Sequence, residues 1–133
     1  MFRNLPPITK NLLLINLICW LADLALGRHG IDLTHWLGLH YVMAPDFYLW
    51  QPLTYMFMHA DFSHLFFNMF AVLMFGPAIE ERWGSRRYLL YYIITGVGAA
   101  LVQESVWALR LQPILSQMDP FSAAYFANKV VTI

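Results

Sequence analysis

The sequence predicts an all-α integral membrane protein, and its composition and its long apolar blocks are the two observations behind that prediction. The chain has 133 residues, of which 59% are hydrophobic and 12% are charged. A soluble domain carries about twice that share of charged residues, roughly 25%. The apolar residues fall into three blocks of bilayer-spanning length, at about 8–27, 62–80 and 87–109. The formal net charge is zero and no basic run occurs, so no nucleic-acid partner is predicted.

The first apolar block, about 8–27, follows a short basic start and is interrupted by a few polar residues. A cleaved signal peptide is the alternative reading, because the segment Ala25-Leu26-Gly27 resembles a cleavage site. The block is longer than the apolar region of a usual signal, and further membrane blocks follow it, which favours a transmembrane helix. Cys19 is the single cysteine, so the chain can form no internal disulfide.

Residues 28–63 form a polar, aromatic and histidine-rich segment between the first two blocks. Pro45 and Pro52 rule out one long helix here, and the aromatic side chains suit a loop at the headgroup layer. Five histidines in the chain raise the question of a metal site. No HExxH motif and no Cys/His cluster with ligand spacing is present, so neither a metal nor another cofactor is predicted.

The second block carries the candidate functional residues, His64 and Asn68. A spacing of four places both side chains on one face of a helix, one turn apart. Polar side chains inside an otherwise apolar span are costly unless they have partners, so they are candidates for function. Both can donate a hydrogen bond from a side-chain N–H and together could stabilise an oxygen anion, but neither supplies a hydroxyl or thiol nucleophile.

The third block, about 87–109, follows a charged turn in which Gly84 gives backbone freedom. Gly96 and Ala100 form a small-xxx-small pair, which predicts close approach of another helix. Residues 110–128 are expected to be an external loop or an interfacial helix. Residues 129–133 are expected to begin a fourth membrane-spanning segment, so the sequence resembles an interrupted protein.

The basic residues predict the orientation of the helices. One side of the membrane would hold Arg3, Lys10, Arg82, Arg86 and Arg87. The other side would hold Arg28, Arg110 and Lys129. Because basic residues favour the cytoplasmic side, the N-terminus is expected in the cytoplasm and the segment 28–63 outside.

Several separated motifs resemble the rhomboid family of intramembrane serine proteases. They are Trp50-Gln51-Pro52-Leu53-Thr54-Tyr55-Met56-Phe57-Met58-His59, Phe62-Ser63-His64-Leu65-Phe66-Phe67-Asn68-Met69, Phe75-Gly76 and Glu80-Glu81-Arg82-Trp83-Gly84-Ser85. The resemblance covers roughly residues 47–103, with the motifs in the family's order and spacing. It implies a rhomboid-like helical bundle with a six-helix core, of which this chain would hold the first three transmembrane helices and the large first external loop.

The resemblance also implies roles for individual residues. His64 and Asn68 match the family's HxxxN pair, whose side chains help to form the oxyanion hole. His59, Glu80 or Glu81, and Arg82 match positions that are structural in the family. Gln51 stands where many members have arginine. The implied activity is serine endopeptidase cleavage of transmembrane protein substrates within the lipid bilayer, and the implied location is a bacterial inner membrane.

The family's nucleophile and base are absent from this chain. Rhomboids take the serine from a GxSG motif on the fourth helix and the base from a histidine on the sixth, and none of the five serines here lies in such a motif. The chain is therefore expected to be the N-terminal part of a protease, inactive without the C-terminal helices of its own domain. One alternative is a non-catalytic rhomboid-like protein that binds transmembrane clients. A small channel or transporter subunit is weaker, because no inverted repeat or charged pore row appears.

Overall fold

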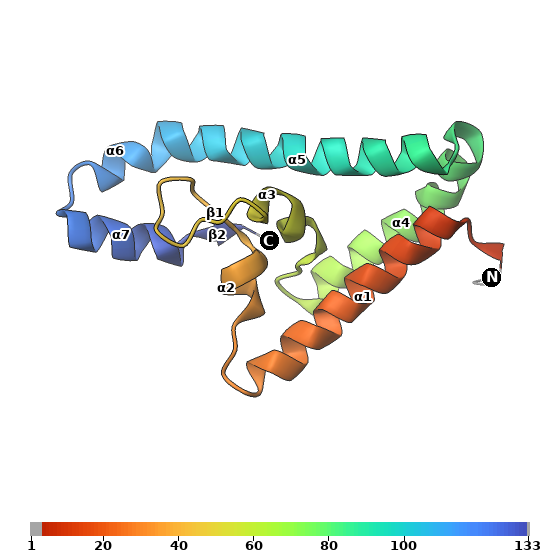
Figure 1. Ribbon diagram of the computed structural model, residues 1–133, viewed down its shortest axis with the longest axis horizontal. Helices are drawn as coiled ribbons and strands as arrows, with labels where there is room; N and C mark the ends of the chain where they lie inside the picture. The colour runs from red at the N-terminus through yellow and green to blue at the C-terminus, as the bar shows by residue number, and fades with distance from the viewer. Residues whose placement is uncertain (1–3, 133) are drawn as a thin grey trace.

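Three long helices dominate the computed structural model, which describes residues 4–132. Each of the three is long and apolar enough to cross a membrane. They are α1 (Pro7–Gly27), α4 (Phe62–Trp83) and α5 (Ser85–Arg110). Figure 1 shows α1 and α4 side by side, while α5 meets α4 at one end of the molecule and diverges from the pair toward the other. The predicted all-α membrane fold is confirmed.

A tight turn at Gly84 connects α4 to α5. This residue has a φ of 87°, a backbone conformation that residues with a side chain rarely adopt. Close packing of α1 on α4 depends on a second glycine, Gly76, where an added Cβ would lie 2.8 Å from Thr9 Oγ1. The contact is sealed by a small apolar cluster that includes Leu12 and Val72. Glycine is therefore required at two points, for a turn and for helix contact.

The first loop fills the space where α5 diverges from α1 and α4 (Figure 1). Its elements are α2 (Leu33–Leu37), β1 (Leu39–His40), α3 (Gln51–Thr54) and the 3₁₀ helix η2 (Tyr55–Phe57). Ala100 of α5 is buried in a cluster with apolar side chains of the loop, and Met56 covers Gly96. The small residues of α5 were expected to receive another helix, but in the structure they receive the loop. A small side chain lets either kind of element approach closely.

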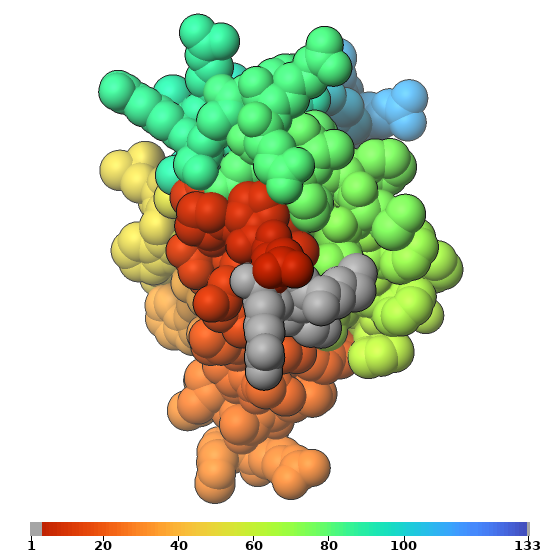
Figure 2. Space-filling model, turned by 90° about the vertical axis from the view of Figure 1, so that its right-hand side faces the viewer, coloured from red at the N-terminus to blue at the C-terminus, as the bar shows by residue number. Residues whose placement is uncertain are grey.

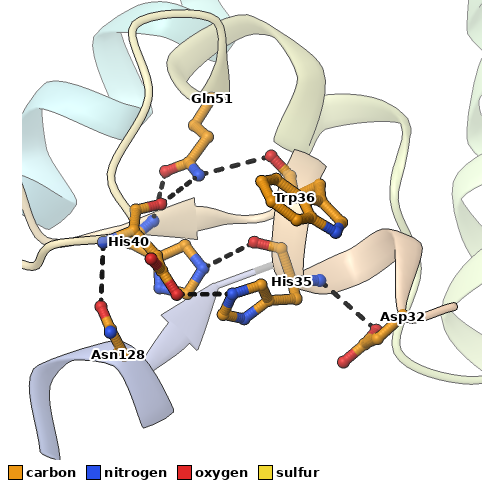
Figure 3. Close-up of polar contacts among 7 residues, drawn as sticks. Asp32, His35, Trp36, His40, Gln51 and Asn128 are labelled. Atoms are coloured by element: carbon orange, nitrogen blue, oxygen red, sulfur yellow. Dashed lines mark hydrogen bonds and ion pairs between the residues drawn. The ribbon is translucent and has the colours of Figure 1, made fainter. Parts of the chain in front are cut away.

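A buried polar network holds the loop together, and Figure 3 shows it around Gln51. The side chain of Gln51 is fully buried. Its Nε2 donates to the carbonyls of Trp36 (3.3 Å) and Asp46 (2.9 Å), and its Oε1 accepts from His40 N at 3.1 Å. His35 Nε2 lies 2.6 Å from Asp46 Oδ2. Gln51 thus links three backbone groups of the loop, of which Trp36 O also accepts from Trp50 Nε1 at 2.9 Å.

Residues after α5 turn back along the loop. They form α6 (Gln112–Leu115), α7 (Pro120–Lys129) and β2 (Val131–Thr132), and β2 pairs antiparallel with β1. Residues 110–128 were expected to be an external loop or an interfacial helix, and the structure forms the two short helices α6 and α7 there. The start of a fourth membrane-spanning segment at 129–133 stays a prediction. Lys129 ends α7, Val130 follows as its cap, and the β-branched residues Val131 and Thr132 take the extended conformation that they favour. Ile133 lies outside the described residues.

The outward faces of the long helices are apolar. Phe67 and Phe75 of α4 are 68% and 66% exposed, and Ile94 of α5 is 66% exposed. A soluble monomer rarely presents contiguous apolar surface of this kind, whereas a lipid environment accommodates it. These faces support an integral membrane protein.

Candidate functional site

The helix that carries His64 and Asn68 begins at a well-defined cap. Asp61 precedes α4 in an extended conformation, and its Oδ1 accepts a hydrogen bond of 2.8 Å from His64 N. This cap fixes the first turn of the helix and with it the direction of the following side chains. His64 is exposed and Asn68, one turn further along, is half-buried. His64 and Asn68 therefore share one face of the helix, but His64 lies on the surface and Asn68 is partly covered by neighbouring residues.

His59 connects the two predicted residues. It lies between η2 and α4 and is 3% exposed. Its Nε2 is 3.1 Å from Asn68 Nδ2, and its ring meets the His64 ring edge-on with 4.9 Å between centroids. Burial lowers the pKa of His59, and the neighbouring His64 lowers it further. The resemblance gave His59 a structural role, and the structure places it directly against Asn68.

Sequence reasoning missed the contribution of α1. Asn16, at the middle of that helix, is 1% exposed. Its Nδ2 donates to Leu12 O at 2.7 Å, and its Oδ1 accepts from Asn68 Nδ2 at 3.4 Å. Tyr92 of α5 brings its hydroxyl to the same two asparagines. The available signal was a polar residue inside an apolar span, which calls for a partner.

The arrangement can donate hydrogen bonds but contains no activated nucleophile in the described part of the chain. The hydroxyl of Ser85 donates to the Glu80 carboxylate of α4, those of Ser105 and Ser116 donate to nearby backbone carbonyls, and none of these acceptors is a histidine. Nor does any group of three or more His, Cys, Asp or Glu side chains within residues 4–132 have a geometry that could hold a metal ion. The site as described is suited to binding a polar or negatively charged oxygen.

Glu80, one of the two acidic positions that the motif left open, is the buried one at 3% exposure. Its carboxylate accepts from Ile8 N (2.9 Å), Thr9 N (2.8 Å), Thr9 Oγ1 (2.9 Å) and Ser85 Oγ (2.6 Å). Glu81 and Arg82 are exposed. Figure 2 shows the start of α1 against the junction of α4 and α5, the end of the molecule where Glu80 lies. Glu80 thus caps α1 from α4, because Pro6 at the cap position offers no side-chain hydrogen bond.

A hollow of about 260 Å³ lies between α1 and α4, beside the helix turn that bears Asn68. Leu13 and Leu17 line it from α1, and Leu65 and Met69 line it from α4. Its lining is apolar, so it offers no hydrogen bond to a ligand. The hollow therefore gives space for an apolar group next to the polar site, but it contributes no catalytic or hydrogen-bonding side chain.

Comparison with known proteins gives one consistent result. The Rhomboid domain family model matches residues 46–114. YdcA of Bacillus subtilis (strain 168) is 30% identical over 97 residues, which are 72% of this chain and 48% of that protein. Rhomboid-like protein 11, chloroplastic, of Arabidopsis thaliana is 38% identical over 91 residues (68% of this chain, 30% of that protein). Rhomboid protease GlpG of Klebsiella pneumoniae (strain ATCC 700721 / MGH 78578) is 28% identical over 101 residues (76% and 36%).

The chain spans less than half of the length of each of these relatives. No solved structure matches it. The matched region includes the first loop from Asp46, all of α4 and α5, and therefore His59, His64 and Asn68. On the family model, the similar proteins and the three apolar helices together, this chain belongs to the rhomboid family.

Proposed function

We propose that this chain forms the oxyanion-stabilising side of an intramembrane serine endopeptidase that cleaves transmembrane protein substrates. The observation that carries the proposal is the meeting of His64 and Asn68 at the buried ring of His59. Two side chains with N–H donors at one end of a membrane helix can stabilise the negative charge that develops on the scissile carbonyl oxygen. GlpG of Klebsiella pneumoniae, which is similar over most of this chain, is named a rhomboid protease.

The nucleophile and the base belong, in this proposal, to further helices of the same domain. No GxSG motif occurs in the chain, and its described serines make no histidine contact of the kind that activates a hydroxyl. A serine protease that lacks either its nucleophilic serine or its base loses orders of magnitude in kcat. The chain alone is therefore expected to be inactive and to give no label with a fluorophosphonate probe.

The test uses the complete protease in proteoliposomes with a transmembrane substrate. His64→Ala and Asn68→Ala are each expected to lower kcat by about 100- to 1,000-fold while KM changes little, as for the loss of one oxyanion donor. Ser63→Ala is the matched control, because this exposed neighbour on the same helix turn should keep full activity. Unchanged cleavage in both His64 and Asn68 variants would refute the proposal and favour a non-catalytic role in binding transmembrane clients.

We also propose that the N-terminus faces the cytoplasm of a bacterial cell and that the chain lies in its inner membrane. Lys10, Arg86 and Arg87 gather at the end of the molecule where α1 begins and α4 meets α5. Basic residues of short loops favour the cytoplasmic side. In intact cells, a membrane-impermeant maleimide should label Leu49→Cys in the first loop, a position that is 89% exposed, and should not label Arg86→Cys. The reverse labelling would overturn the orientation.

A further inference from the structure

A chain of hydrogen bonds begins at a backbone carbonyl of α1 and ends at the ring of His59. Asn16 Nδ2 donates to Leu12 O, and Asn16 Oδ1 accepts from Asn68 Nδ2. Asn68 Nδ2 also faces His59 Nε2 at 3.1 Å. The three side chains come from α1, from α4 and from the segment before α4. Their order means that the orientation of one amide decides the orientation of the next.

The direction of this chain follows from its first member. A carbonyl can only accept, so the side-chain atom of Asn16 that faces Leu12 O must be the NH₂ group. The oxygen of Asn16 then faces Asn68, which must present its own NH₂ group there. That same NH₂ group faces His59 Nε2, which must act as an acceptor. His59 is therefore neutral, with its proton on Nδ1, a buried atom that has no hydrogen-bond partner among the described residues.

We propose that Asn16 is a positioning residue, which fixes the Asn68 carboxamide in one orientation and, through it, the neutral Nδ1–H form of His59. The inference rests on the proposed role of Asn68 in stabilising an oxyanion. Both N–H bonds of Asn68 already have acceptors, at 3.4 Å and 3.1 Å. An incoming oxygen anion must share one of these protons, and the longer contact, to Asn16, is the weaker one. Asn16 thus holds the donor in place without binding it tightly.

Two further titratable groups lie close to His59. His64 of α4 stacks edge-on against it, and the Asp61 carboxylate lies two residues away as the cap of α4. A protonated His59 would place an N–H against the NH₂ group of Asn68 and a positive charge beside His64. Without Asn16, the Tyr92 hydroxyl still faces Asn68. Because a hydroxyl can donate or accept, it allows the Asn68 amide to turn its oxygen toward His59, which then accepts a proton at Nε2 more readily.

The experiment is ¹⁵N NMR of this chain, labelled at histidine and asparagine, in detergent micelles over a pH series. The wild type should show His59 with Nδ1 protonated and Nε2 unprotonated. Asn16→Leu, which keeps the branching at Cγ but removes both polar groups, should give a mixture of tautomers. It should also move the His59 titration upward by about one pH unit, the net worth of one hydrogen bond. Asn11→Ala, at an exposed asparagine on the same helix, is the matched control and should leave both readouts unchanged.

Two outcomes would overturn the proposal: an Nε2–H tautomer in the wild type, or an unaltered His59 signal in a folded Asn16→Leu variant. A second variant, Asn16→Ala, covers the case in which leucine does not fit. In the complete protease, Asn16→Leu should lower kcat about tenfold with KM unchanged, and a shift in the acid limb of the pH profile should accompany it. The NMR result tests the hydrogen-bond chain by itself, so it remains interpretable if His64 and Asn68 prove to have no catalytic role.

Discussion

Removal of the Glu80 carboxylate should weaken the packing of α1 against α4 and α5. Glu80→Ala leaves the N–H groups of Ile8 and Thr9 without partners at the start of α1, because no side chain of α1 itself caps that end. An unsatisfied buried donor costs about 1–3 kcal/mol, and two backbone donors lose their acceptor here. We expect a loss of about 4 kcal/mol in the free energy of unfolding.

Glu80→Gln removes the negative charge of the side chain but keeps its shape. The amide oxygen can still accept two hydrogen bonds, but the NH₂ group meets the donor N–H of Ile8 and leaves it unsatisfied. We expect a smaller loss, about 1–3 kcal/mol. Glu81→Gln is the matched control, since Glu81 is exposed on the next residue and its loss should cost less than about 0.5 kcal/mol.

The assay is equilibrium unfolding by SDS in mild detergent micelles, followed by tryptophan fluorescence. The order of stability should be wild type and Glu81→Gln together, then Glu80→Gln, then Glu80→Ala. If Glu80→Ala unfolded at the same SDS fraction as Glu81→Gln, the capping role of Glu80 would be refuted. Cleavage of the α1 start by protease, measured on the folded variants, gives an independent local readout.

Three further predictions concern packing, the loop and pH. Gly76→Ala should cost about 1–3 kcal/mol, because the new methyl meets Thr9 Oγ1 at 2.8 Å, whereas Gly98→Ala, with open space around it, should not destabilise; SDS unfolding compares the two. Gln51→Leu should leave His40 N and Asp46 O without this partner, while Trp36 O keeps the Trp50 Nε1 donor, and should cost about 2 kcal/mol, seen as faster hydrogen exchange throughout the first loop. The lowered pKa of His59 means that the unfolded chain binds more protons, so stability should be full above pH 6.5 and should fall as the pH drops below that value. A stability that rises on acidification through this range would contradict that reasoning.

The long helices could be predicted from the sequence, because each is a local pattern. An apolar block of bilayer length specifies a helix almost regardless of its neighbours, and Gly84 marks the turn between two of them. The predicted pair in α4 also depended on local spacing alone. What the pattern could not supply was the partner of each polar side chain, since Asn16 and Asn68 are 52 positions apart.

The interior of the first loop could not be predicted for the same physical reason. Gln51 gave no signal by its type, because an amide can serve an exposed surface or a buried network equally well. Its role depends on the close approach of Trp36, His40 and Asp46, which tertiary folding creates. Glu80 shows the contrast within one motif: Glu80 and Glu81 are chemically identical, and only the position of α1 distinguishes them.

The pairing of β1 with β2 has a consequence for biosynthesis. Leu39 and His40 leave the ribosome long before Val131 and Thr132, their hydrogen-bonded partners, have been translated. Until then the loop has an open backbone edge and must wait beside a membrane that already holds three apolar segments. A contact between residues so far apart in the sequence closes slowly. We therefore expect misfolding or chaperone capture to involve the nascent first loop more than the three helices.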